Sequence, residues 1–266
     1  MNVALTIAGV DSSGGAGVSA DLAAFAAQGV WGACAVTAVT AQNSTGVEAV
    51  ELLSADIVDA QIAAVCDDMR IGAIKTGMLG SAAMMATVAA ALPFGIPLVV
   101  DPVMVATTGA SLFDGEADFA ALIAKATIVT PNASEARALT GVEVGDENAM
   151  VQAARAVLEH GCHAVLVKGG HVGDGPARDC LLIAGQPGPV WLESARLTTD
   201  EVHGTGCVLS ASIAAGLALG DDIASACRRG KAAVTDAIRD RVKAGRGVAA
   251  AAPSAASWRY GRAPGA

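Results

Sequence analysis

The sequence predicts an α/β fold, a three-layer αβα sandwich in which a mainly parallel sheet lies between two layers of helices. The first observation is that short apolar segments alternate with helical segments over most of the 266 residues. Such alternation is typical of parallel strands joined by right-handed helical crossovers, which cover both faces of the sheet. The second observation is that polar residues follow the predicted strands at the points where they end. In an open α/β sheet the ligand crevice lies at this edge.

The predicted elements follow one another without an internal repeat or a linker. Strands are expected at 3–8, 32–39, 71–75, 97–100, within 123–129 and at 164–167. Helices are expected from Asp21, over 57–69, 81–92, 133–139 and 147–160, from Gly206, and from Asp221 to about Val242. The segments 179–184 and 190–193, joined by the turn 185–189, predict a small antiparallel hairpin at one edge of the sheet. We expect a single domain over residues 1–266, with a poorly ordered Ala-, Gly- and Pro-rich tail from about Gly245.

Charge and composition exclude several classes of partner. The formal net charge of -9 leaves no basic surface for nucleic acid. The long apolar stretch 81–100 is interrupted by Pro93 and Pro97, so it predicts a helix and a buried strand and not a membrane span. The six cysteines form no C-x-x-C pair, and the four histidines have no metal-ligand spacing. We therefore expect a cytoplasmic protein with reduced thiols and no nucleic-acid or membrane partner.

The segment His203–Cys207 is the strongest local signal. It places Gly204, Thr205 and Gly206 directly before an apolar run with small residues at helical spacing. A tight loop that leads into a buried helix presents unpaired backbone N–H groups and a positive dipole end, which together bind an anion such as a phosphate. Cys207 stands at this helix start, where we expect the pKa of its thiol to be lowered. The alternative is a Gly-rich turn with a small buried cysteine.

Three more positions near strand ends have a chemical and a structural interpretation. Asp101 and Glu135 could hold Mg²⁺ through oxygen and water ligands, but Asn132 and Glu135 also have the spacing of a helix capping box. Lys168 could place a point charge on a nucleotide phosphate, or it could be a solvated lysine at a strand end. The chain contains neither a G-x-x-x-x-G-K-[ST] motif nor a clean G-x-G-x-x-G motif, so a P-loop is not indicated.

A second group of residues could form a small pocket for an acceptor. Gln42 offers a donor and an acceptor on one planar amide, which suits the edge of an aminopyrimidine, although polar loop residues of this kind are common. Ala16, Met78 and Val105 could be the apolar walls of this pocket or ordinary core residues.

The sequence resembles the hydroxymethylpyrimidine/phosphomethylpyrimidine kinases of the ribokinase-like superfamily from about Ala4 to Val242. The resemblance is carried by LTIAGVDSSGGAGVSADL, AVTAVTAQNSTGV, IKTGMLG, DPVMVATTGASL, VTPNASEA, VLVKGGH and HGTGCVLSASIAAGLA, which occur in the family's order. It implies an αβα sandwich with its active site at the carboxyl ends of the strands. It also implies ATP-dependent phosphorylation of 4-amino-5-hydroxymethyl-2-methylpyrimidine, then of its monophosphate, in thiamine biosynthesis.

The resemblance also implies roles for single residues. Gly204, Thr205, Gly206 and Cys207 would form the anion hole, with Cys207 as the base or as the group that positions the hydroxyl. Lys168, Thr205 and Asn132 would lie at the ATP phosphates, and Glu135 with Asp101 would hold Mg²⁺. The pyrimidine pocket would be lined by Gly9, Ala16, Asp21, Gln42, Met78 and Val105. Relatives also imply a homodimer.

Two alternatives remain at this point. A pyridoxal or pyridoxine kinase uses the same scaffold and also phosphorylates a small heteroaromatic alcohol. A catalytically idle nucleotide- or vitamin-binding regulator is the alternative from another class, and the presence together of Asn132, Glu135, Lys168 and Cys207 argues against it.

Overall fold

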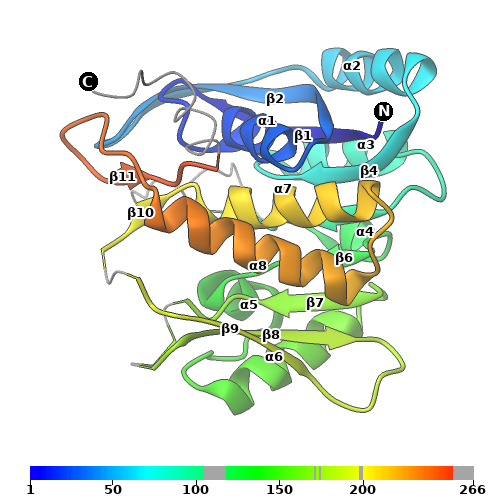
Figure 1. Cartoon of the computed structure of the whole chain (residues 1–266). Helices are drawn as coiled ribbons and strands as arrows, with labels where there is room; N and C mark the ends of the chain where they lie inside the picture. The colour runs from blue at the N-terminus through cyan, green and yellow to red at the C-terminus, as the bar shows by residue number, and fades with distance from the viewer. Residues whose placement is uncertain (105–117, 171, 174, 198–199, 254–266) are drawn as a thin grey trace.

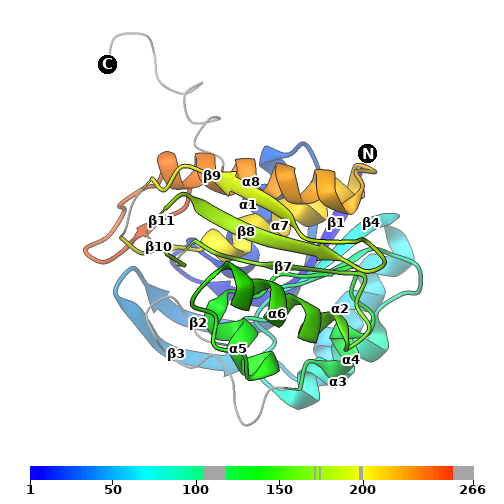
Figure 2. The same cartoon turned by 90° about the horizontal axis from the view of Figure 1, so that it is seen from below.

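The computed structural model describes residues 1–104, 118–170, 172–173, 175–197 and 200–253 of the chain. In this part of the chain, nine strands form one sheet in the order β3-β2-β1-β4-β5-β6-β7-β8-β9, with helices on both faces (Figures 1 and 2). The strands are β1 (Val3–Asp11), β2 (Trp31–Asn43), β3 (Gly46–Leu52), β4 (Ile71–Thr76), β5 (Leu98–Val100), β6 (Ile128–Val129), β7 (Ala164–Val167), β8 (Ala177–Ile183) and β9 (Val190–Ser194). The predicted α/β architecture is confirmed.

The centre of the sheet is parallel and both edges are antiparallel. Strands β2, β1, β4, β5, β6 and β7 pair in parallel, and β8 and β9 form the predicted hairpin at one edge. At the other edge β3 pairs antiparallel with β2, and the sequence pattern does not predict this strand. Its residues are mostly exposed on both faces and include Glu48 and Glu51, so no apolar alternation identifies it.

The helices divide between the two faces. Successive side chains of a strand point to opposite faces of the sheet, so the core consists of two apolar clusters. One cluster lies under α1, α7 and α8, and the other lies under α2, α3, α4, α5 and α6. The helices are α1 (Gly17–Ala27), α2 (Ala55–Asp68), α3 (Ala82–Ala91), α4 (Ala120–Ile123), α5 (Ala133–Thr140), α6 (Glu147–Leu158), α7 (Thr205–Ala218) and α8 (Ile223–Arg239). In the described residues, no helix combines the length and the apolarity that a membrane span requires.

Helix α7 is the central helix of its layer. All of its residues from Val208 to Leu217 are buried, and it packs on β1, β4, β5, α1 and α8. Close contact with α8 depends on Gly230, because a Cβ atom there would lie 2.7 Å from the Ile213 side chain. Since a helix that is apolar on all sides is stable only when it is buried, the sequence of α7 dictates its central place. Its N-terminus then points to the carboxyl ends of the parallel strands.

The segment that follows α8 departs from the expected poorly ordered tail. Strand β11 (Ala249–Ala250) pairs in parallel with β10 (Val202–His203), and the Ala251 N–H donates to the His203 carbonyl at 2.9 Å. Ala251 and Ala252 are buried against the rest of the protein. Because alanine side chains are small, this Ala-rich segment fits a narrow space, which its composition alone does not reveal. Residues 254–266 lie outside the described part.

Candidate active site

The polar residues predicted at the strand ends meet at one edge of the sheet. Asp11 ends β1, Lys75 lies at the end of β4 and Asp101 follows β5. Asn132 and Lys168 follow β6 and β7 and are paired through their backbones. Strand β1 lies between β2 and β4, so the chain leaves it toward one side and returns on the other. A crevice is expected at such a switch point.

The predicted anion loop has the geometry of a helix N-terminus. Gly204 caps α7 with a φ of 77°, a conformation that favours glycine. A Cβ atom on Gly204 would lie 1.9 Å from the Gly15 carbonyl oxygen, so the anion loop and the Gly-rich loop after β1 touch through their backbones. The first-turn N–H groups of α7 therefore face the strand ends, where they can bind a phosphate.

Lys168 lies between two carboxylates and close to this helix start. Its Nζ atom is 3.0 Å from Asp101 Oδ1 and 3.5 Å from Glu135 Oε2. A Cβ atom on Gly206 would lie 3.4 Å from the same Nζ atom, so the ammonium group lies directly beside the first turn of α7. Burial would raise the pKa of Asp101, but the charges of Lys168 and Lys75 outweigh it and hold this pKa below its ordinary value. Burial and the nearby charge of Asp101 raise the pKa of Glu135.

Asn132 and Glu135 also form the predicted capping box of α5. The Glu135 N–H donates to Asn132 Oδ1 at 2.8 Å, and the Asn132 N–H donates to Glu135 Oε2 at 2.7 Å. While it caps the helix, Glu135 Oε2 also faces the cationic Lys168 Nζ atom. The capping role is therefore compatible with a role in binding a cation. The described residues contain no group of three or more His, Cys, Asp or Glu side chains placed to hold a metal ion. Two carboxylates that share one cation position fit Mg²⁺, which usually keeps waters and binds substrate phosphates as well.

A buried ion pair joins the end of β4 to α1. Lys75 Nζ is 2.9 and 2.8 Å from the two carboxylate oxygens of Asp21, and Thr6 donates to Asp21 Oδ2 at 2.6 Å. The Lys75 and Asp21 side chains have no exposed surface. Asp21, one of the residues predicted for the pyrimidine pocket, therefore exposes no side-chain surface at the strand ends. Its oxygens hold Lys75, whose charge interacts with Cys207.

The thiol of Cys207 differs from the expectation of a lowered pKa. Removal from water raises the pKa of Cys207 to about 11, although Lys75 and the Gly17 N–H lower it. The carboxylates of Asp21 and Asp101 add to the increase. A thiol at a helix N-terminus has a lowered pKa only where the effect of the helix is larger than the opposite effect of desolvation. The raised pKa favours the neutral thiol form of Cys207 at neutral pH.

A cluster of three residues joins the Gly-rich loop to the anion loop. His203 Nε2 lies 2.8 Å from Asp11 Oδ2 and 3.1 Å from the Gln42 side-chain amide nitrogen. Burial would raise the pKa of Asp11, but hydrogen bonds from His203 and Ser13 outweigh it and lower this pKa. Sequence reasoning did not identify His203 as a site residue. Its position directly before Gly204 was the available signal.

Three of the predicted pocket residues come together. A Cβ atom on Gly9 would lie 3.1 Å from Met78 Sδ, and one on Gly17 would lie 2.2 Å from the Gly9 carbonyl oxygen. Ala16 precedes Gly17 as the N-cap of α1. Val105 lies outside the described residues.

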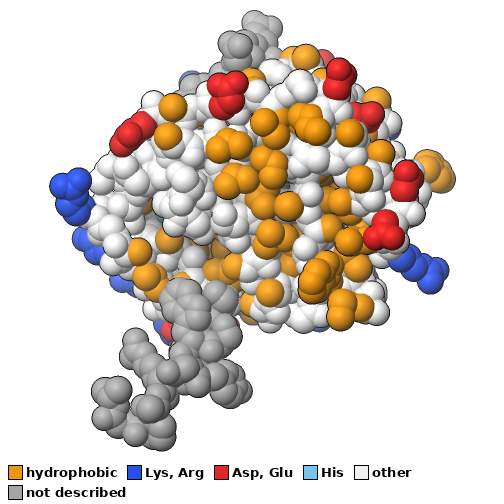
Figure 3. All heavy atoms as spheres, turned by 90° about the horizontal axis from the view of Figure 1, so that it is seen from above, with side chains coloured by type: hydrophobic (Ala, Val, Ile, Leu, Met, Phe, Trp, Pro, Cys, Tyr) orange, Lys and Arg blue, Asp and Glu red, His pale blue; other side chains and the backbone are white. Residues whose placement is uncertain are grey.

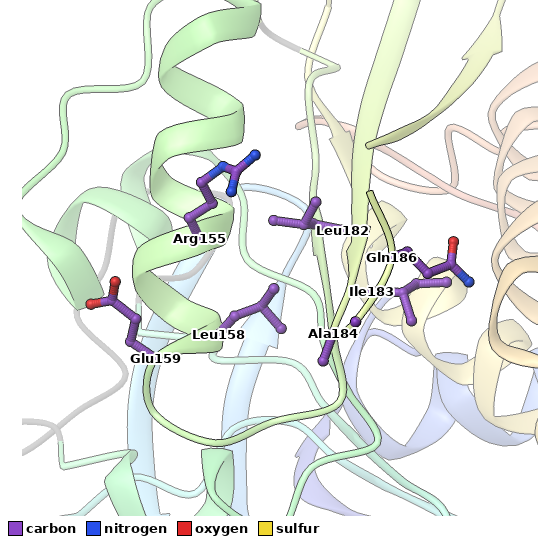
Figure 4. Close-up of a pocket in the computed structure, with 8 residues that line it drawn as sticks. Arg155, Leu158, Glu159, Leu182, Ile183, Ala184 and Gln186 are labelled. Atoms are coloured by element: carbon purple, nitrogen blue, oxygen red, sulfur yellow. The ribbon is translucent and has the colours of Figure 1, made fainter. Parts of the chain in front are cut away.

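Another hollow lies away from these residues. It has a volume of about 280 Å³ and is lined by the end of α6, the end of β8 and the following turn (Figure 4). The end of β8 pairs with the start of β7. The hollow therefore lies at the amino end of β7, whereas the anion loop lies at the carboxyl ends of the parallel strands. None of the predicted site residues lines it.

Comparison with known proteins gives a family for the sequence and for the fold. The family model described as "Phosphomethylpyrimidine kinase" matches residues 11–252. A hydroxymethylpyrimidine/phosphomethylpyrimidine kinase of Rhizobium meliloti is 48% identical over 253 residues, which are 92% of this chain and 94% of that protein.

Solved structures agree with this result. A phosphomethylpyrimidine kinase of Clostridium difficile superposes with a TM-score of 0.77 and 39% identity, covering 90% of this chain and 100% of that one. An ADP complex of Bacillus subtilis pyridoxal kinase superposes with a TM-score of 0.84 and 32% identity, covering 97% of this chain and 99% of that one.

Proposed function

The chain belongs to the phosphomethylpyrimidine kinase family, and from this premise we propose how its residues carry out the reaction. The protein is an ATP-dependent kinase of thiamine biosynthesis. It phosphorylates 4-amino-5-hydroxymethyl-2-methylpyrimidine and then the monophosphate. The observation that supports our assignment of the site is the position of Lys168, 3.0 Å from Asp101 and beside the first turn of α7.

The phosphates of ATP would lie between Lys168 and the start of α7. The backbone N–H groups of the Gly204–Cys207 loop stabilise the charge that moves during phosphoryl transfer, and this reaction depends mostly on positioning and electrostatics. Thr205 and Asn132 would also contact these phosphates. Asp101 and Glu135 would hold Mg²⁺, which supplies charge neutralisation on the phosphate oxygens when it is bound. Lys168, which contacts both carboxylates, would then contact the nucleotide phosphates.

The pyrimidine would bind on the other side of Cys207. Gly9, Ala16 and Met78 would be its apolar walls, and the Gln42 amide would provide the donor and the acceptor for the ring edge. Val105 is proposed as a further wall from the sequence alone. Asp21 acts from below by holding Lys75 under the Cys207 thiol.

Cys207 faces the hydroxyl that attacks the γ-phosphate. A thiol with a pKa of about 11 is a poor base at neutral pH, which supports a role in positioning this hydroxyl. The transition state of phosphoryl transfer needs little help from a base, because the hydroxyl loses its proton late.

A pyridoxal kinase is the second candidate, because the superposition on the Bacillus subtilis enzyme is close. Incubation with ATP, Mg²⁺ and either alcohol, followed by mass spectrometry of the products and steady-state kinetics, tests both. We expect the pyrimidine mono- and diphosphates to form and kcat/KM to favour the pyrimidine. A clear preference for pyridoxal would overturn the assignment. Nucleotide binding without any ADP formation would indicate a regulator.

We propose a homodimer formed through the face around α1, β2 and α2, called the apolar face below. Apolar side chains gather on the side of the molecule where these elements lie (Figure 3). Its exposed large side chains include Trp31, Val39 and Ile57, which are 56%, 48% and 48% exposed. Extended apolar surface of this kind marks interaction sites.

We also propose a single domain in the cytoplasm. The site draws residues from Gly9 to Cys207, which supports one folding unit. All six cysteines are free thiols, which is typical of a reducing compartment.

A further inference from the structure

A buried carboxylate outside the crevice contacts the turn that carries Lys168. Asp179 lies in β8 and is 3% exposed. Its Oδ1 atom accepts a hydrogen bond from the Gly169 N–H at 2.9 Å, and its Oδ2 atom lies 2.8 Å from Lys231 Nζ on α8. Nothing in the proposed reaction uses Asp179 or Lys231.

The antiparallel direction of β8 explains how Asp179 reaches this turn. Val167, the last residue of β7, pairs with Cys180 in β8. Because β8 runs opposite to β7, its first residues lie beside the carboxyl end of β7, where the chain turns through Lys168 and Gly169. The approach is close, since a Cβ atom on Gly169 would lie 1.9 Å from the Arg178 carbonyl oxygen.

The backbone around Lys168 is held on both sides. The Lys168 N–H donates to the Pro131 carbonyl at 2.8 Å, and the next N–H, that of Gly169, donates to Asp179. A hydrogen bond from a backbone N–H to a carboxylate is stronger than one between neutral groups. Lys231 balances the charge of Asp179 inside the protein, where an unpaired carboxylate would be costly.

We propose that Asp179 is a positioning residue that fixes the 168–169 turn and thereby directs the Lys168 ammonium group toward the ATP phosphates. The inference rests on the proposed contact of Lys168 with ATP. It predicts an effect on the nucleotide and none on the pyrimidine, because the Asp179 side chain lies on the β7–β8 side of the crevice.

The test compares two double variants that both remove the ion pair. Asp179→Asn/Lys231→Met keeps an oxygen that accepts the Gly169 N–H, whereas Asp179→Leu/Lys231→Met removes it and has a side chain of similar size. Neither variant leaves a buried unpaired charge. Loss of the acceptor is expected to raise KM for ATP about tenfold over the Asn variant, with KM for the pyrimidine unchanged.

A third arm shows that the effect passes through Lys168. In the Lys168→Met background, which itself raises KM for ATP, the Leu and Asn variants should have equal KM values, because neighbouring residues that act as one unit are not additive. Asp221→Leu, which breaks the Arg229 ion pair of α8, is the control and should keep the normal KM for ATP.

Each result decides between the proposals. If Lys168→Met raises KM for ATP while the Leu and Asn variants agree in the normal background, the role of Asp179 is overturned and that of Lys168 stands. If the Leu variant loses thermal stability and both KM values rise together, Asp179 is only structural. If Lys168→Met leaves KM for ATP unchanged, the ATP contact of Lys168 and this inference both fail.

Discussion

At the residue scale, the proposed chemistry depends most on Cys207. Its thiol lies at a helix start near the Lys75 ammonium group, two features that lower a thiol pKa. Desolvation and the Asp21 and Asp101 carboxylates outweigh them. The sequence shows the helix start, but desolvation depends on how residues far apart in the chain pack, so no local pattern reveals it.

Replacement of Cys207 separates positioning from base catalysis. Cys207→Ser keeps a hydrogen-bonding group of similar size, and Cys207→Ala removes it. We expect Cys207→Ala to lower kcat about 100-fold or more while KM for both substrates changes little, because positioning contributes mainly in the transition state. Cys207→Ser should retain most of kcat. If steady-state kinetics show the serine variant to be as impaired as the alanine variant, Cys207 is the base.

The pH dependence of alkylation tests the thiol pKa directly. The thiolate is the reactive form, and an increase from the ordinary 9.0 to about 11 makes its fraction at neutral pH about 100-fold smaller. Iodoacetamide labelling of Cys207, followed by peptide mass spectrometry, should be slow at pH 7. Its rate should rise with pH until about 11. Rapid labelling at pH 7 would contradict a raised pKa of Cys207.

The meeting of the strand-end residues could be predicted from the sequence because its signal is local. Lys168, Asp101 and Asn132 follow apolar strands, and parallel strands bring their carboxyl ends to one edge, so their meeting could be predicted. His203 and Asp11 are separated by 192 residues, and Lys75 and Asp21 by 54, so only the fold reveals these pairs. Asp21 shows the difference, since the family resemblance gives it a place in the pyrimidine pocket, while only the fold reveals its ion pair with Lys75.

At the element scale, the anion loop depends on one glycine contact. Gly204→Ala would add a Cβ atom 1.9 Å from the Gly15 carbonyl oxygen, in a backbone conformation that costs a non-glycine residue about 1–2 kcal/mol. We expect loss of kcat and a lower free energy of unfolding in urea. Gly220→Ala is the matched control. It also has a positive φ, but nothing lies within 4 Å of the added atom.

The two variants share the backbone cost and differ in the contact. Gly220→Ala should therefore lose some stability and keep kcat, whereas Gly204→Ala should lose both. Equal kinetics for the two variants would show that contact between the two loops is not needed for catalysis.

Elements with one apolar face or a buried apolar run were predictable, and exposed elements were not. The β8–β9 hairpin was expected from two short segments joined by a turn. Helix α7 was expected because it is apolar on all sides and must therefore be buried. Strand β3 lacks such a pattern, and its place depends on pairing with β2. Residues 249–252 have the composition of a disordered tail, and only the narrow space beside β10 and α8 selects their structure.

At the scale of the whole molecule, the apolar face predicts the state of association. Trp31→Glu/Ile57→Glu places two charges on this face, and a charge in an apolar interface is unfavourable. Sedimentation equilibrium should give twice 26.2 kDa for the unmodified protein and 26.2 kDa for the variant. Leu219→Glu, at an exposed leucine outside the face, is the control and should remain dimeric. A monomeric unmodified protein would refute the dimer.

The contact of Gly15 with His203 and Gly204 also constrains when the enzyme becomes active during its synthesis. Asp11, at the end of β1 and next to the loop that contains Gly15, leaves the ribosome early, but its partner His203 is 192 residues later along the chain, a delay of roughly 10–40 s at ordinary rates of translation. Until then the central place of α7 in its layer is empty, and the apolar sheet surface beneath it is exposed. The nascent chain is therefore inactive and prone to aggregate until nearly all of it has been translated, which makes it a natural client for chaperones.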